Sequence, residues 1–436
     1  MSSAVPGSQA YQKWLNLSVV MRSIRENPGI SRTELARSTG LTKSTVGNLV
    51  RELLSRRVLR EHSLESPASS GRPRVGLDLP DGGFLIGGLD LRPEGYRVRV
   101  HDLAGRVIHA FSRRAGEAEG MGTSHGATPA DPAGRFAVLL RGALADLIRE
   151  AHAGGSRRLI GVGIALPATV DPFRGRILHS ESFDLQKLSM REHLGEEPTL
   201  PLVIENDANA LAWSALGRNR ARRGRNLLAV TARLPESWNR RSPELQGRDD
   251  PAATPPSLNV GTGVVLDGSV YYGSDFNGGE FRSSPWRRGD PGETSGRGWP
   301  ASRASAAGGS VAAEGAPRSP LDQALGELFE SLAVLVSVLR PERLVYAGAL
   351  VGLESRIVRL LHGELAGSSV DPAVSGCVVE PAAEGEYAVA SGAADMFTER
   401  LFSLPGVDAP RPGEIPRWDD FPEESAALTG KPEVTA

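Results

Sequence analysis

The sequence has one cysteine, few aromatic residues and no long hydrophobic run. With Cys377 alone, an internal disulfide framework and a cysteine-rich zinc or iron–sulfur site are excluded. Because no run of about 18 apolar residues occurs, the sequence predicts no membrane span, and its N-terminus lacks a secretory signal pattern. Aromatic residues make up only 5% of the chain, but the 40% of hydrophobic residues are enough for buried cores. We therefore expect a cytoplasmic protein of two or three domains.

Charge is distributed unevenly along the chain. Residues 1–80 contain 12 Lys and Arg against 6 Asp and Glu, whereas the remainder contains 38 against 46. A basic N-terminal segment joined to a larger acidic body indicates nucleic-acid binding at one end and a different task at the other.

The basic segment has the pattern of a helix-turn-helix. Helical spacing of apolar residues predicts a first helix over 11–27. Ser31 and Glu34 have the spacing of a capping box that opens a short second helix, and Gly40 supplies the tight turn after it. A third helix is predicted over 43–56, with an apolar inner face. Two short apolar runs around a Ser/Pro/Gly tip then predict a winged hairpin, which completes a domain over 11–80.

Polar and basic residues on the third helix and the wing favour contact with double-stranded DNA over the alternative of a three-helix packing module. Asn48 suits adenine, and Arg51 suits guanine or phosphate. Arg72 and Arg74 on the wing suit a minor groove or phosphate. The candidate DNA-binding residues are Arg32, Thr33, Thr42, Lys43, Ser44, Thr45, Asn48, Arg51, Arg72 and Arg74.

A second, α/β domain is predicted over 84–402. It opens with three strands, FLIGGLDL, YRVRVHDL and AGRVIHAFSRR, and later alternates buried strands with amphipathic helices. Irregular insertions are expected at about 115–132, 233–257 and 283–319. The Pro-rich, acidic segment 403–436 is predicted to be a disordered tail.

From Leu17 to about Phe402 the sequence resembles the ROK family of transcriptional repressors, open reading frames and sugar kinases. The motifs that carry the resemblance, in order, are GISRTELARSTGLTKSTVGNLVRELL with SSGRP, GGLDL, GVGIALPATVD, ENDANALA, GTGVVLDGSVYYG, GGE, LVYAGAL and SGAA. The resemblance implies a winged helix-turn-helix followed by a bilobal actin-like (ribonuclease H-like) domain.

Three elements that hold the nucleotide in kinases of this family are altered here. The first phosphate loop, D-x-G-G-T in the kinases, reads Asp90-Leu91-Arg92-Pro93-Glu94, so the glycines that let a phosphate approach the backbone are missing. An insertion separates the second loop, Gly261-Thr262-Gly263, from the strand before it, and the adenine-side glycine pair is reduced to Gly348-Ala349. We therefore predict that the domain binds no ATP, and we expect no cofactor.

The sugar-binding positions of the family are retained better than its nucleotide-binding positions. It implies that Asn206 and Asp207 bind sugar hydroxyls, that Asp207 stands at the position of the kinases' general base, and that Glu280 is a further hydroxyl ligand. A purely structural alternative is that Asn206 and Asp207 only cap the helix that follows. The zinc-binding part is absent, since Ser283 replaces the expected His and no cysteine cluster follows, so no metal is expected.

The leading hypothesis is a DNA-binding transcriptional regulator, most simply a repressor, with a non-catalytic domain for effector sensing and dimerisation. The family implies a homodimer or homotetramer, a sugar or sugar derivative as effector, and an inverted-repeat operator. One alternative is a constitutive DNA-binding dimeric protein without a sugar ligand. The other is an ATP-dependent sugar kinase with Asp207 as base.

Overall fold

The computed structural model forms two compact units. The first comprises Met1–Arg225, Gly263–Gly278 and Ala382–Ala436, and the second comprises Asn226–Thr262 and Gly279–Pro381. The structure describes residues 8–64, 74–115, 131–153, 157–194, 200–217, 226–233, 259–280, 320–353, 357, 376–405 and 415–422. Nearly all of the three predicted insertions lies outside these described residues.

The N-terminal part of the first unit is a winged helix-turn-helix. Its elements are α1 (Gln9–Glu26), α2 (Arg32–Thr39), α3 (Lys43–Ser55), β1 (Arg60–Leu64) and β2 (Arg74–Asp78). Ser31 and Glu34 form the predicted capping box, and Gly40 ends α2 in the left-handed conformation with φ +72°. The two wing strands pair antiparallel.

The rest of the first unit is built on a five-stranded sheet in the order β10-β6-β3-β4-β5. The strands β3, β4 and β5 form the predicted antiparallel meander, and β6 and β10 are parallel to β3. Three short strands, β7, β8 and β9, make a separate small sheet. The bounds are β3 Phe84–Arg92, β4 Gly95–Asp102, β5 Val107–Arg114, β6 Arg158–Leu166, β7 Thr169–Asp171, β8 Arg176–Ser180, β9 Leu185–Ser189 and β10 Leu202–Asn206.

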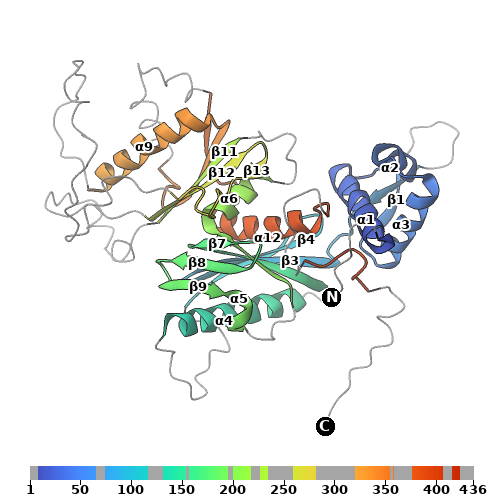
Figure 1. The fold of residues 1–436 in the computed structure, drawn as a ribbon, viewed down its shortest axis with the longest axis horizontal. Helices are drawn as coiled ribbons and strands as arrows, with labels where there is room; N and C mark the ends of the chain where they lie inside the picture. The colour runs from blue at the N-terminus through green and yellow to red at the C-terminus, as the bar shows by residue number, and fades with distance from the viewer. Residues whose placement is uncertain are drawn as a thin grey trace, which may run out of the picture. The chain divides into compact units, whose positions relative to one another are not determined.

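Helices cover both faces of this sheet, and glycines in β3 set their approach. A Cβ on Gly87 would meet Leu147 of α4 (Pro132–His152), whereas one on the next residue, Gly88, would lie 1.9 Å from the carbonyl oxygen of Ala390 in α12 (Ala388–Leu401). Because neighbouring residues of a strand point to opposite faces, α4 and α12 pack on opposite sides (Figure 1). Helix α6 (Asp207–Leu216) then packs on α12, and α5 spans Met190–Leu194.

The second unit contains most of a mixed sheet in the order β13-β12-β11-β14-β15. Strands β11, β14 and β15 run parallel, as expected for the core of an α/β lobe. The bounds are β11 Leu227–Arg233, β12 Asn259–Leu266, β13 Ser269–Val270, α9 Pro320–Leu339, β14 Arg343–Gly348 and β15 Val378–Pro381, followed in the first unit by the 3-10 turn η3 Gly385–Tyr387.

The C-terminal segment differs from the sequence prediction of a disordered tail over 403–436. Residues 415–422 are described, and Trp418 has no exposed surface while Phe421 is only 3% exposed. Both join a hydrophobic cluster with Leu17 of α1 and Phe402. The composition of the segment did not predict this packing, because burial of three apolar side chains, Ile415, Trp418 and Phe421, is enough to hold an otherwise polar stretch against the core.

Candidate functional site

The third helix of the winged domain, α3, begins after the N-cap residue Thr42. Thr42 Oγ1 accepts a hydrogen bond from the backbone N–H of Thr45 over 3.1 Å, and it lies 2.9 Å from the Ser44 hydroxyl. A threonine in the extended conformation before a helix satisfies one of the free N–H groups of the first turn. The start of α3 is therefore fixed by local sequence, as predicted.

Helix α3 is divided into a buried face and a polar face. The buried residues, inside the winged helix-turn-helix domain that we call the winged head, are Val46, Leu49, Val50 and Leu53. The exposed candidate residues are Thr42, Lys43, Ser44, Asn48 and Arg51, and Thr45 is half-buried. Arg51 Nη1 donates to Asn48 Oδ1 over 3.1 Å, so the two side chains hold one another on the same face of the helix. The structure thus brings the predicted α3 residues together on one accessible surface.

The remaining DNA-binding candidates lie on α2 and the wing. Arg32 and Thr33 are exposed in the first turn of α2, and Arg32 Nη2 lies 2.7 Å from Glu61 Oε1. Arg74 is the first residue of β2, paired in register with Leu64. Arg72 lies outside the described residues.

Asn206 and Asp207 stand where β10 ends and α6 begins. The Asn206 side chain is the N-cap: its Oδ1 accepts from the N–H groups of Ala208 and Asn209 at 2.8 and 3.2 Å, and its Nδ2 donates to the Ala168 carbonyl at 3.0 Å. Asp207 is only 3% exposed. The capping role is therefore real, and it leaves one amide hydrogen of Asn206 for another partner.

A buried polar cluster that the sequence analysis missed supports this site. Glu205 is fully buried and accepts hydrogen bonds from the Tyr272 hydroxyl at 2.7 Å and from the Asn206 N–H at 2.9 Å. Arg400 Nη2 lies 3.8 Å from Glu205 Oε2. Burial raises the pKa of Glu205 above its ordinary value, although the charge of Arg400 and the hydrogen bonds act the other way. The one sequence signal was a charged residue at the end of an apolar strand.

The first phosphate loop of the kinases is replaced here by a closed hairpin. Strand β3 runs through Arg92, and Pro93-Glu94 form a tight turn into β4, where Gly95 has φ +148° and pairs with Arg92. Arg92 Nε lies 3.1 Å from Asp90 Oδ1 and its Nη2 lies 2.8 Å from Oδ2, with Asp90 fully buried.

The Arg92 guanidinium balances the negative charge of the carboxylates around it. Burial lowers the pKa of Arg92, but the charge and hydrogen bond of Asp90 raise it more, and the charges of Asp207 and Glu94 add to the rise. Asp207 is therefore one of the carboxylates whose negative charge acts on the Arg92 guanidinium. The end of β3, at the position of the kinases' first phosphate loop, thus carries a pair of opposite charges.

The other two nucleotide elements are also built into packed structure. Gly261-Thr262-Gly263 lie inside strand β12 and not in an open loop, and the Thr262 hydroxyl donates to the Gly279 carbonyl. Gly348 has φ +75°, and a Cβ there would lie 2.3 Å from the Ala232 carbonyl oxygen. Backbone packing thus explains the glycine at position 348.

Glu280 belongs to the second unit, where it is exposed. Ser283, at the position of the family's histidine, lies outside the described residues. Among the residues that the structure describes, no group of three or more His, Cys, Asp or Glu side chains has the geometry to hold a metal ion. No helix within the described ranges is long and apolar enough to cross a membrane.

Two family models match the chain. The model described as winged helix-turn-helix DNA-binding matches residues 20–60, and the ROK family model matches residues 121–232. The structure also resembles the crystal structure of a ROK family transcriptional regulator, a homolog of the E. coli MLC protein. The two share 19% identity with a TM-score of 0.61, over 90% of this chain and 97% of that one.

Among curated proteins, the xylose repressor of Caldicellulosiruptor bescii is 27% identical over 47% of this chain and 48% of its own. The xylose repressor of Bacillus subtilis is 22% identical over 62% and 60%. The DNA-binding transcriptional dual regulator NagC of Escherichia coli is 22% identical over 63% and 60%. The chain thus aligns with about half to three fifths of the length of these relatives. The chain thus carries a winged helix-turn-helix domain followed by a ROK family domain, whose model matches residues 121–232, and its fold is that of the ROK transcriptional regulator.

Proposed function

We propose that the protein is a transcriptional regulator, acting as a repressor, that binds double-stranded DNA through its winged head and senses a sugar-type effector with a non-catalytic ROK domain. The observation that carries the proposal is the polar face of α3, where Lys43, Asn48 and Arg51 are exposed opposite a buried apolar face. Such a helix can enter a major groove without disturbing the core behind it. The names of the relatives, repressors for xylose and N-acetylglucosamine, agree with this role.

The ROK domain supports sensing better than catalysis. Arg92 pairs with Asp90 at the position of the kinases' first phosphate loop, and Gly261 to Gly263 lie within a strand. We infer that Asn206 and Asp207 contact the hydroxyls of the effector. The role of Glu280, which belongs to the second unit, stays a prediction from the sequence. A constitutive DNA-binding protein without a sugar ligand would instead show no response to sugars.

The test of the proposal is selection of genomic DNA fragments with the full chain at about 50 and 200 mM salt. Two heads in a homodimer or homotetramer should select a short inverted repeat that survives the higher salt. Recovery of only salt-sensitive, sequence-independent DNA would contradict the proposal, because non-specific binding depends on phosphate contacts alone.

Effector binding is tested separately by thermal unfolding with D-xylose, N-acetylglucosamine and a panel of other sugars. A ligand at 100 times its Kd should stabilise the fold by about 2.7 kcal/mol. Asp207→Ala should abolish that shift, and the variant should still select the same DNA repeat. An unchanged shift in this variant would reduce Asp207 to a structural residue.

The recognition face is tested by Asn48→Ala and Arg51→Ala. Each should weaken binding to the selected repeat by about 1–3 kcal/mol, or roughly 5- to 150-fold in Kd, because each removes a group suited to a base edge. Arg141→Ala is the matched control, since it removes an exposed arginine from α4 of the ROK domain. Normal binding by both α3 variants, measured by fluorescence anisotropy, would refute the assignment.

A further inference from the structure

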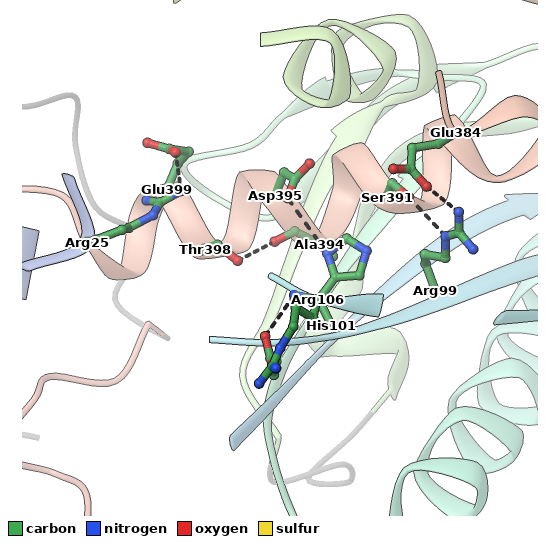
Figure 2. A network of polar contacts seen from close by, with 11 residues as sticks. Arg25, Arg99, His101, Arg106, Glu384, Ser391, Ala394, Asp395, Thr398 and Glu399 are labelled. Carbon is green, nitrogen blue, oxygen red and sulfur yellow. Dashed lines mark hydrogen bonds and ion pairs between the residues drawn. The ribbon is translucent and has the colours of Figure 1, made fainter. Parts of the chain in front are cut away.

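The last turn of α12 carries two neighbouring charged residues that contact different parts of the first unit. Glu399 Oε1 lies 2.6 Å from Arg25 Nη2 of α1, in the DNA-binding head (Figure 2). The next residue, Arg400, lies 3.8 Å from Glu205 beside the candidate effector site. One helical turn thus contacts both the head and the end of β10.

The contact with the head is specific and well shielded. The Arg25 and Glu399 side chains are only 14% and 20% exposed, and the Arg25 guanidinium lies 4.7 Å from the centre of the Phe402 ring. Apolar residues of α12 and α1, including Phe397 and Met21, belong to one hydrophobic cluster. The position of α1 therefore depends on the position of the end of α12.

Arg400, which makes the contact with the candidate effector site, is also held by several neighbours. Arg400 is 10% exposed at its side chain, donates from Nη1 to the Pro172 carbonyl at 3.1 Å, and lies over the Phe173 ring at 5.6 Å. Glu205, its partner, accepts from the Asn206 N–H and from Asn209 Nδ2 at 3.2 Å. Arg400 is thus linked through one carboxylate to Asn206, the residue before Asp207, and to Asn209, two residues after it.

Helices α12 and α6 are in direct backbone contact. A Cβ on Gly392 of α12 would lie 1.6 Å from the Ala210 carbonyl oxygen of α6, and one on Gly163 of β6 would lie 1.9 Å from that of Ala393. Close-packed backbones leave little room for α6 to move without moving α12. A change at the N-terminus of α6 therefore has a short physical route to the end of α12.

We propose that Glu399 and Arg400 form the coupling element of the protein, through which occupancy of the Asn206–Asp207 site changes how the DNA-binding head is held. The proposal rests on the proposed function and adds its regulation. An effector acts by binding one arrangement of this link better than another. The coupling should change DNA affinity by roughly 5- to 150-fold, the usual range for two linked sites.

The test is a double-mutant cycle read by hydrogen–deuterium exchange of the full chain, which needs neither a known effector nor a known operator. Asp207→Asn perturbs the site, Arg400→Met breaks the link, and the readout is amide exchange in α1. We expect Asp207→Asn to change α1 exchange at least about 3-fold when Arg400 is present and not when it is Met. Arg400→Lys, which keeps the charge, should restore part of the response.

Two controls separate coupling from general loosening. Arg99→Met removes a similarly buried arginine, 15% exposed, whose partners Glu384 and Ser391 lie at the other end of α12 (Figure 2), and it should leave the response of α1 intact. Exchange in α4 should match wild type in every variant. If Arg400→Met fails to fold, Glu399→Gln breaks the same link on its more exposed side.

An additive cycle, or an α1 that ignores Asp207→Asn in both backgrounds, would overturn the proposal. Failure of the proposed function would appear in the DNA selection experiment, where the wild-type protein would select no inverted repeat. A selected repeat with an additive cycle rejects the coupling alone, and a non-additive cycle without a repeat rejects the DNA function alone.

Discussion

At the scale of single residues, Asp90 shows how the chain differs from a working phosphate site. Its carboxylate is fully buried and is neutralised by Arg92, two residues further along the same strand, with Arg97 Nη1 at 3.8 Å. Residues two apart on a strand share a face, so the pairing follows from the sequence once β3 is known to continue through Arg92. The buried charge of Asp90 is thus neutralised within the protein.

Arg92→Met should destabilise the fold by about 3 kcal/mol, because it leaves the buried Asp90 carboxylate without its main partner. Arg174→Met is the matched control. Its partner Asp171 is also buried but keeps hydrogen bonds from the N–H groups of Phe173 and residue 174, and Arg174 is 75% exposed. The control should cost less than about 1 kcal/mol. Equal losses in urea unfolding would contradict this account of Asp90.

Glu52 of α3 should make the stability of the head depend on pH. Burial raises its pKa, but hydrogen bonds with Lys13 and Arg56 lower it more, so the net pKa lies below its ordinary value. A lowered pKa means that stabilisation is present above the ordinary value of about 4.3 and is lost as pH falls through the folded-state pKa.

The free energy of unfolding of Glu52→Gln should therefore lie about 0.5–1 kcal/mol below wild type at pH 7, and the difference should vanish towards pH 3. Glu26→Gln, which removes a 60% exposed carboxylate paired with Arg22, should show little difference at either pH. A constant gap between wild type and Glu52→Gln across this range would rule out the ionic origin of the effect.

At the scale of elements, two glycines in helices have opposite surroundings. A Cβ added at Gly47 of α3 would have no atom within 4 Å among the described residues, so no neighbouring helix there requires a glycine. Gly392 of α12 is needed for the close approach of α6. Helix propensity therefore decides the cost of the first glycine, and packing decides the second.

We expect Gly47→Ala to raise the free energy of unfolding by up to about 1 kcal/mol and Gly392→Ala to lower it by about 1–3 kcal/mol or more. Thermal unfolding of the two variants checks both signs. A stabilised Gly47→Ala protein that binds DNA more weakly would place residue 47 against the DNA. Destabilisation by Gly47→Ala would show that the helix has a neighbour outside the described residues.

At the scale of the whole molecule, the winged head shares a core with the rest of the first unit. The hydrophobic cluster combines Val20 of α1, Phe84 of β3, Met396 of α12 and Trp418 of the C-terminal segment. Tyr11 donates to the Pro405 carbonyl at 3.0 Å, and Arg417 lies 4.5 Å from the centre of the Trp14 ring. The C-terminal segment thus joins two parts of the chain that are far apart in sequence.

Trp418→Ala should therefore destabilise the protein by about 3–5 kcal/mol and increase amide exchange in α1, because it removes a fully buried indole from this shared cluster. Val338→Ala, at a valine of α9 that is 71% exposed, should change stability by less than about 0.5 kcal/mol. Urea unfolding and exchange of the two variants give the comparison. Wild-type stability of Trp418→Ala would mean that residues 415–422 only cover the surface.

The sequence alone determined the features that form within a few residues. The capping box of Ser31, the N-cap at Thr42 and the helix start at Asn206 were predictable, because each is made by hydrogen bonds spanning two or three positions. Apolar periodicity similarly predicted the recognition helix and the strands of the meander. The contacts of Glu205 with Tyr272 and Arg400, and the docking of Trp418, were decided by the tertiary structure, because they join residues that only long-range packing brings together.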